Sequence, residues 1–159
     1  MKIEQAQEAD YKALTDIAFS AKRYWNYPES YYELWCGELT ITAAYITENI
    51  VFKAIHEETV VGFYSIVDNP SDAYFGDVFV KKGIWLEHIF VKPEYHRQGA
   101  GRLLIKHVKK ICQAMGVETL SIFVDPFARG FYDKIGAHFA YESKSSIPGR
   151  FIPVYELKI

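Results

Sequence analysis

The pattern of hydrophobic and polar positions is clearest between residues 85 and 115 of the 159-residue chain. Residues 85–91 are mainly aromatic and β-branched, a composition typical of a largely buried strand. Pro93 ends that strand because proline has no amide hydrogen to donate to a sheet. Apolar residues then recur on one predicted helix face, at Leu104, Val108, Ile111 and Met115, and Gly116 stops the helix. The stretch therefore predicts a strand, a glycine turn and a helix.

The flanking segments predict further short elements. Before the central stretch we expect strands at 2–5, 51–56 and 60–67, and helices from about Glu8 to Ala21 and at 29–36. The first helix has an apolar face of Leu14, Ile17, Ala18 and Ala21. Residues 39–46 fit a helix or a strand, and residues 74–80 a strand piece. After it we expect strands at 120–124, 138–143 and 154–159 and a helix from about Phe127 to Ile135.

This order of elements predicts the fold class. Helices, a hairpin, a strand–helix–strand–helix unit and a final hairpin indicate an α/β (α+β) fold with a mixed, mostly antiparallel sheet and helices on both faces. The strands joined by the central helix should be parallel. A length of 159 residues predicts one domain, 1–159, and no repeat or linker interrupts it.

Composition and charge narrow the classes of function. A net charge of −2 with interspersed signs gives no basic stripe for nucleic acid. We expect no membrane span, since no apolar run is long enough, and no signal peptide at Met1 to Glu4. Two cysteines, Cys36 and Cys112, predict neither a disulfide framework nor a metal site, and Cys112 is expected in the core. These features favour a cytoplasmic protein.

The glycine turn is the candidate binding element. Gly99 and Gly101 let the backbone approach a ligand closely, and the following helix start offers amides without internal partners. Such amides and the positive end of the helix dipole suit a diphosphate. A Walker loop is excluded because no Gly-Lys-Ser/Thr follows, and a dinucleotide fingerprint because Leu occupies position 104.

Two segments carry a family resemblance. Val91-x-Pro93-x-Tyr95-His96-Arg97-Gln98-Gly99-Ala100-Gly101 resembles the acetyl-coenzyme A loop of the GNAT superfamily of N-acetyltransferases, with His96 where Gln or Arg is usual. Residues 120–137 resemble the family's next strand and its Asn-x-x-Ala-x-x-Phe-Tyr-x-x-x-Gly segment, with Asp125 in place of Asn. The resemblance is strong over residues 85–140 and implies a sheet whose two central parallel strands splay apart to admit the pantetheine arm.

The resemblance implies a set of coenzyme-binding residues: Ile89, Phe90 and Val91 through the strand backbone, and His96, Arg97, Gln98, Gly99, Ala100, Gly101, Arg102, Asp125 and Ala128. Asp125 is open to a second interpretation, because an aspartate before Pro126 can cap the following helix. His96 could donate to phosphate or face water.

The resemblance also implies two catalytic residues. Tyr132, the second aromatic of the matched Phe-Tyr pair, would be the general acid for the departing thiolate. Glu87 would take the proton of the amine, and His88 is the competing base. Alternation along a strand puts Glu87 and His88 on opposite faces. Either of these residues, or a water chain, could be the base.

The implied function is transfer of an acetyl group from acetyl-coenzyme A to a primary amine of a small molecule or peptide, by direct attack and without metal. A non-catalytic acyl-coenzyme A sensor is the alternative, since the same loop would serve it. We further expect residues 145–153 to close over the acceptor, with Arg150 as a carboxylate ligand. A homodimer is a possible assembly.

Overall fold

The computed structural model describes all residues from Met1 to Ile159, and they divide into two compact units. The first unit comprises Met1–Ile66 and His88–Val108, and the second comprises Val67–Glu87 and Lys109–Ile159. Strands β3 (Thr59–Asn69) and β6 (Gly83–Val91) and helix α4 (Ala100–Ala114) run from one unit into the other. One domain over residues 1–159 stays a prediction.

The first helix of the first unit follows the predicted apolar spacing. After the short 3₁₀ turn η1 (Glu8–Asp10) come α1 (Tyr11–Arg23), α2 (Glu29–Leu39) and α3 (Ala43–Glu48). The predicted face of α1 is confirmed, since Leu14, Ile17, Ala18 and Ala21 are buried. Of residues 39–46, which fitted a helix or a strand, Leu39 ends α2 and residues from Ala43 onward belong to α3. The Thr42 hydroxyl caps α3 by accepting from the Tyr45 amide at 3.0 Å.

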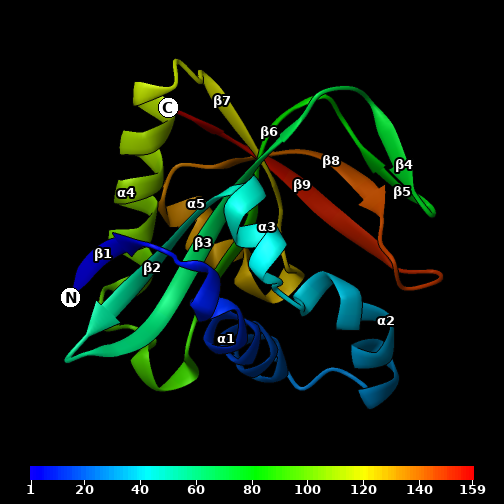
Figure 1. The fold of residues 1–159 in the computed structure, drawn as a ribbon. Coiled ribbons are helices and arrows are strands. Elements are labelled where there is room, and N and C mark those ends of the chain that lie inside the picture. The colour runs from blue at the N-terminus through cyan, green and yellow to red at the C-terminus, as the bar shows by residue number, and fades with distance from the viewer. The chain divides into compact units, whose positions relative to one another are not determined.

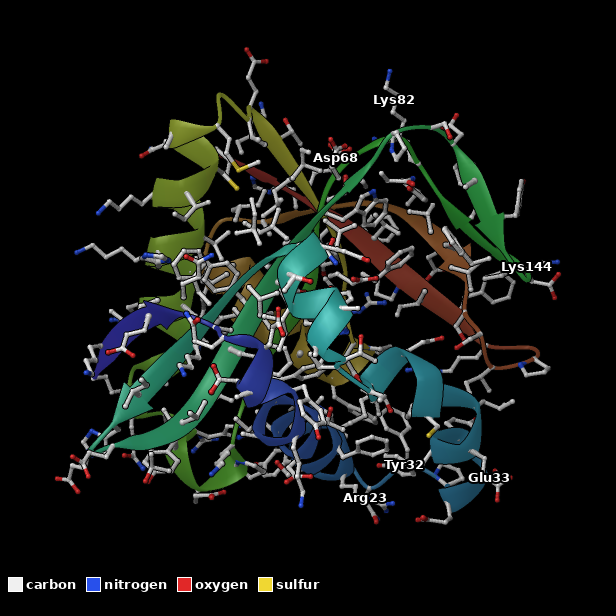
Figure 2. All side chains as sticks on the ribbon, viewed as in Figure 1. Arg23, Tyr32, Glu33, Asp68, Lys82 and Lys144 are labelled. Carbon is white, nitrogen blue, oxygen red and sulfur yellow. The ribbon has the colours of Figure 1, made fainter.

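Arg23 at the end of α1 contacts two side chains of α2, Glu29 and Tyr32 (Figure 2 labels Arg23 and Tyr32). The Arg23 guanidinium donates two hydrogen bonds to the Glu29 carboxylate, each 3.0 Å long. It also lies 4.3 Å from the ring centroid of Tyr32, which is buried. A planar guanidinium can hold a carboxylate and stack on an aromatic ring at once, so Arg23 contacts α2 in both ways.

Strands β1 (Lys2–Gln5) and β2 (Ile50–His56) lead into β3 and β6 in the order β1-β2-β3-β6 (Figure 1). The pairs β1–β2 and β2–β3 are antiparallel. Ala54 pairs with Gly62 whereas the next residue, Ile55, pairs with Val60, so Val61 is the extra residue of a bulge. Gly62 follows that bulge directly, where β3 meets β6.

The second unit continues from β6 in the order β6-β7-β9-β8, with β7 (Thr119–Phe123), β8 (His138–Lys144) and β9 (Phe151–Lys158). The β6–β7 pair is parallel, as predicted, and its registered pairs are Trp85 with Ser121 and Leu86 with Ile122. The β7–β9 and β8–β9 pairs are antiparallel. Turn η3 (Pro126–Ala128) and helix α5 (Arg129–Lys134) follow β7. The class is therefore mixed α/β with mostly antiparallel pairing.

One predicted strand is wrong. Residues 74–80 form a hairpin of two strands, β4 (Ala73–Phe75) and β5 (Val78–Val80), instead of a single piece. Gly76 has φ +62°, which suits the first position of a two-residue hairpin turn. The Asn69 side-chain amide donates to the carbonyls of Val80 and Lys81 at 3.1 and 3.0 Å, and closes the base of this hairpin.

The predicted core face of α4 is partly wrong. Leu104 and Val108 are fully buried as expected, but Met115 is 44% exposed. Ile105 and Cys112 are buried with them, so the buried stripe runs through positions 104, 105, 108 and 112. The helix ends at Ala114, and Met115 belongs to the turn that precedes Gly116. No helix of the chain has the length and apolar character needed to cross a membrane.

Candidate functional site

The end of β6 presents backbone amides at one edge. The Lys92 amide donates to the Val61 carbonyl of β3 at 2.8 Å. Because successive peptide groups of a strand point to opposite edges, the amides of Ile89 and Val91 point away from β3. The carbonyl of Phe90 accordingly faces β3, where a Cβ built on Gly62 would lie only 2.7 Å from it. The Ile89 and Val91 amides belong to the strand backbone that the family resemblance implied would bind the coenzyme.

The turn after β6 holds two residues in left-handed backbone conformations. The 3₁₀ turn η2 (Pro93–Tyr95) ends the strand, and then Arg97 has φ +60° and Gly99 has φ +88°. The first helical hydrogen bond of α4 runs from the Leu103 amide to the Gly99 carbonyl, at 2.9 Å. The amides from Gly99 to Arg102 therefore have no partner inside the helix, and the positive end of its dipole lies there.

Two polar side chains of the turn are used to hold it together. The His96 Nε2 donates to the Val91 carbonyl at 3.1 Å, and its ring meets Tyr24 edge to face, 4.8 Å between centroids. The Gln98 amide group donates to the Glu94 carbonyl at 2.8 Å. His96 and Gln98 thus stabilise the turn, and their direct contact with a coenzyme stays a prediction.

The other predicted loop residues differ in exposure. Ala100 is buried, with 1% of its surface exposed, so its side chain anchors the start of α4 in the core. Arg97 and Arg102 are exposed and flank the amides from Gly99 to Arg102. Their charges and these amides form a positively charged segment without a carboxylate between residues 96 and 102.

Glu87 and His88 have the opposite environments that strand alternation predicts. Glu87 is exposed, whereas His88 is buried. The His88 Nε2 contacts the Glu38 carbonyl at 3.0 Å, and its Nδ1 lies 2.8 Å from Ser65 Oγ and 3.1 Å from the Tyr45 hydroxyl. These two hydroxyls are 2.8 Å apart and hydrogen-bond each other. Both ring nitrogens of His88 are therefore engaged with protein groups.

In the second unit Tyr132 is a buried residue of α5. Its ring contacts Phe131 and Tyr155, with centroids 5.2 and 6.4 Å away. Burial raises the pKa of the Tyr132 phenol, and the nearby Asp125 carboxylate raises it further. The phenol is therefore protonated throughout the neutral range, which is the state that a proton donor requires.

Asp125 caps the turn that follows β7. Its Oδ1 accepts from the Phe127 amide at 3.0 Å, and Pro126 occupies the first position of η3. This geometry is the capping interpretation that the sequence left open. Ala128, which ends η3, is half-buried. A role for Asp125 and Ala128 in binding a coenzyme stays a prediction.

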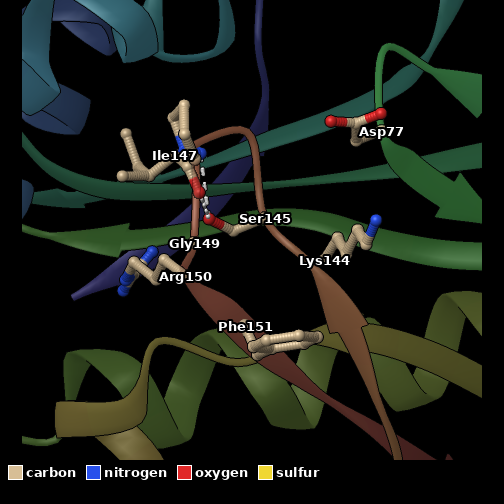
Figure 3. A pocket seen from close by; sticks show the side chains of 8 residues that line it. Asp77, Lys144, Ser145, Ile147, Gly149, Arg150 and Phe151 are labelled. Carbon is tan, nitrogen blue, oxygen red and sulfur yellow. Dashed lines mark hydrogen bonds between the residues drawn. The ribbon is translucent and has the colours of Figure 1, made fainter.

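The connection between β8 and β9 is shorter than expected. Phe151 already belongs to β9, so the loop comprises residues 145–150, and Pro153 lies within the strand. The Ser145 Oγ accepts from the Ile147 amide at 3.0 Å and lies 3.3 Å from the Ile147 carbonyl (Figure 3). Ser145 and Ile147 are both buried. The loop is therefore tightly built around its own hydrogen bonds.

Sequence reasoning missed the partners of His88. Glu38, Tyr45 and Ser65 lie 50, 43 and 23 residues from His88 along the chain. None of them belongs to a motif, and hydrophobic spacing does not mark a polar cluster. A buried histidine inside an apolar strand was the single available signal, since a buried imidazole requires hydrogen-bond partners.

Three solved structures that share this fold are named as N-acetyltransferases. A GCN5-related N-acetyltransferase from Rhodopseudomonas palustris has a TM-score of 0.77 at 18% identity, covering 99% of this chain and 95% of that one. PaiA N-acetyltransferase from Thermoplasma acidophilum, in complex with coenzyme A, has 0.75 at 19%, covering 99% and 98%. The ribosomal-protein-S18-alanine N-acetyltransferase from Escherichia coli has 0.67 at 20%, covering 99% and 93%.

The family assignment comes from the sequence match. No curated protein is similar enough to be matched. The acetyltransferase (GNAT) family model matches residues 11–137, which include the whole segment from β6 to the end of α5. The match spans most of the chain and contains both segments that resembled the family. The chain therefore belongs to the GNAT family of acetyltransferases.

Proposed function

We propose that the protein transfers an acetyl group from acetyl-coenzyme A to a primary amine of a small molecule or peptide. The observation that carries this proposal is the start of α4, where the amides from Gly99 to Arg102 have no helical partner. Gly99, the last residue before α4, has φ +88°, a left-handed conformation that suits glycine. A diphosphate is the part of coenzyme A that such a helix start suits.

The residues present fit that group. Arg97 and Arg102 add two exposed guanidinium groups beside the amides. Their hydrogen bonds to phosphate would be charge-assisted, and such bonds are stronger than those between neutral groups. The amides of Ile89 and Val91, which point away from β3, would donate to the pantetheine arm and to the thioester carbonyl. Donors held by a strand need no reorganisation when negative charge develops on that oxygen.

The chemistry needs a base and an acid. The neutral amine attacks the thioester carbon, a carbon–nitrogen bond forms and the carbon–sulfur bond breaks. The nitrogen then loses one proton to water, and the coenzyme leaves as a thiolate. We assign Glu87 to take the proton that the ammonium form of the acceptor must lose, because its carboxylate is exposed. We assign Tyr132 to give its proton to the thiolate, because a phenol is protonated at neutral pH and burial raises the pKa of this one above its ordinary value. His88 is the weaker candidate base since its Nδ1 already faces two hydroxyls.

A binding experiment tests the proposed coenzyme cradle. We expect the Gly99→Ala variant to bind acetyl-coenzyme A about tenfold more weakly by calorimetry, because a left-handed backbone is strained by about 1–2 kcal/mol in a non-glycine residue. Gly116→Ala is the matched control: Gly116 has φ +71°, and a Cβ there also meets open space. Equal affinities of the two variants would contradict the cradle.

An acceptor panel tests the reaction. Free thiol released from acetyl-coenzyme A should appear with a subset of amines, and the panel includes an alanine-terminated peptide because one similar structure is a ribosomal-protein alanine N-acetyltransferase.

Tyr132→Phe should lower kcat by about 10²-fold, with the buried Tyr155→Phe as control. Glu87→Gln should lower kcat/KM most at neutral pH, with exposed Glu118→Gln as control. Coenzyme binding without thiol release across the panel would support the sensor alternative.

Two further properties belong to the proposal. Cys36 and Cys112 are free thiols, which agrees with a cytoplasmic protein that uses a cytoplasmic acyl donor. Sedimentation of the purified chain would distinguish a monomer from a homodimer, the assembly that the resemblance leaves open.

A further inference from the structure

His88 is a buried polar residue in the middle of the strand that carries the candidate thioester donors. It is 8% exposed and directly precedes Ile89 in β6. The amide nitrogen of Ile89 is bonded to the carbonyl carbon of His88, and the atoms of this peptide group lie in one plane. The group that presents the Ile89 amide hydrogen therefore shares a Cα atom with the imidazole side chain.

Hydrogen bonds hold the imidazole at both ring nitrogens. The Nε2 lies 3.0 Å from the carbonyl of Glu38, the second-last residue of α2. That carbonyl is one of the last four in the helix, which have no donor within it. The Nδ1 lies 2.8 Å from the hydroxyl of Ser65, which is fully buried in β3. The ring therefore links β6 to the end of a helix and to a neighbouring strand.

Aromatic packing restricts the same ring further. Its centroid lies 6.0 Å from that of Phe63, a fully buried residue of β3, and 5.9 Å from that of Phe90 in β6 itself. The ring of Tyr45 in α3 meets it edge to face at 5.5 Å. A rotation of the imidazole would break both hydrogen bonds and these contacts together, so the surroundings fix its side-chain torsions.

Other contacts hold β6 before and after this point. The registered pairs with β7 involve residues 85 and 86, and the Lys92 amide donates to the Val61 carbonyl of β3 at 2.8 Å. The Ile89 amide lies between these positions along the strand. His88 is thus a buried side chain that anchors β6 at the peptide group where a donor to the thioester is needed.

We propose that His88 is a positioning residue for acetyl transfer, an inference that rests on the function proposed above. The locked imidazole fixes the peptide group between residues 88 and 89, and so keeps the Ile89 amide at the strand edge that faces away from β3. Negative charge grows on the thioester oxygen when the amine attacks, so a misdirected donor weakens the transition state more than the bound ground state. Loss of the imidazole should lower kcat and leave the affinity for acetyl-coenzyme A nearly unchanged.

Isotope-edited infrared spectroscopy tests the proposal without turnover. Acetyl-coenzyme A labelled with ¹³C at the thioester carbonyl is bound to the wild type and to His88→Leu, with no acceptor present. A hydrogen bond to a carbonyl oxygen lowers its stretching frequency, so the carbonyl should absorb at a higher frequency in His88→Leu. The dissociation constant from calorimetry should stay within about twofold, because the donor matters most in the transition state. Equal frequencies in the two complexes would overturn the proposal.

His107→Leu is the matched control. The His107 Nδ1 lies 2.8 Å from the hydroxyl of Tyr64, which is fully buried, so this variant also takes an imidazole from a buried hydroxyl, but from α4 instead of β6. Its thioester frequency should equal that of the wild type. With an acceptor from the panel, kcat should fall about tenfold in His88→Leu, less than when a donor is removed outright, and stay unchanged in His107→Leu. Equal losses of kcat in both variants would contradict positioning.

Two amide variants keep the test valid if His88→Leu does not fold. The side chain introduced by His88→Gln can donate to the Glu38 carbonyl, whereas that of His88→Asn is one methylene shorter and does not span the same distance. The frequency should stay near that of the wild type in His88→Gln and rise in His88→Asn, and no difference between them would overturn the proposal. Failure of the wild type to bind acetyl-coenzyme A would refute the proposed function as well, whereas binding with equal frequencies would refute the positioning role alone.

Discussion

The His88 Nε2 donates a hydrogen bond to the main-chain carbonyl of Glu38, 3.0 Å away, and this contact sets the tautomer of the imidazole. A carbonyl oxygen can only accept, so the proton of the neutral ring is on Nε2, and Nδ1 accepts from a hydroxyl. Ser65 and Tyr45 supply that hydroxyl at 2.8 and 3.1 Å. One ring thus joins β6 to the end of α2, to α3 and to β3.

The first prediction follows from this network. His88→Leu should lower the free energy of unfolding by about 1–3 kcal/mol, because the Glu38 carbonyl and the Ser65 hydroxyl, which is fully buried, would lose a partner. The pH profile of kcat/KM should keep its shape if Glu87 is the base. Denaturant unfolding and a pH series measure the two effects. Tyr45→Phe is the control and should lower the free energy of unfolding less. If the acidic limb of the kcat/KM pH profile disappears in His88→Leu, His88 is the base instead of Glu87.

The second prediction concerns Gly62. A Cβ there would lie 2.7 Å from the Phe90 carbonyl and 3.2 Å from Val91 Cγ2, so Gly62→Ala must push β6 away from β3. We expect a loss of about 1–3 kcal/mol in the free energy of unfolding. Acetyl-coenzyme A affinity should fall as well, since the displaced strand carries the Ile89 and Val91 amides.

Gly37→Ala is the control for this variant. Gly37 lies in α2, is exposed, and has open space around the position of a Cβ. Alanine is the better helix former by about 0.5–1 kcal/mol, so this variant should gain stability. Chemical denaturation of both proteins would decide the matter, and a Gly62→Ala protein as stable as wild type would refute the packing argument.

The third prediction is a pH dependence of stability. Burial raises the pKa of the Cys112 thiol from its ordinary 9.0 to about 11. The unfolded chain releases this proton at a lower pH than the folded chain does. The contribution of Cys112 to stability is therefore fully present below pH 9 and is lost as pH rises through 11, by up to about 3 kcal/mol.

Comparison of two cysteine variants measures this effect. Unfolding of Cys112→Ala between pH 8 and 11 should show a shallower loss of stability than wild type, whatever its stability at pH 8. Cys36→Ala, at an exposed cysteine, should follow the wild-type slope. Parallel slopes for all three proteins would mean that the Cys112 thiol ionises in the folded state as readily as in the unfolded one.

Much of the fold could be predicted because its signals are local. The strand–turn–helix of residues 83–114 follows from a β-branched run, Pro93 and the glycines, all within one short stretch. The core stripe of α4 was less certain because Leu103, Leu104 and Ile105 are consecutive, so apolar spacing alone cannot select one face. The β4–β5 hairpin was missed although Gly76-Asp77 between apolar residues is a hairpin signal.

The candidate site was predictable where it depends on backbone. The free amides at the start of α4 follow from the position of Gly99, and the direction of the Ile89 and Val91 amides follows from strand geometry. Side-chain roles were harder to foresee. His96 and Gln98 bond to backbone carbonyls within the turn, and such contacts depend on its exact path.

The backbone of Arg97 has a lasting consequence for how this chain could be altered. At φ +60° a residue with a side chain is less stable than glycine by about 1–2 kcal/mol. Selection for thermal stability would therefore favour Arg97→Gly. This substitution would remove a positive charge beside the N-terminus of α4. At position 97, higher thermal stability and affinity for an anionic ligand therefore favour different residues.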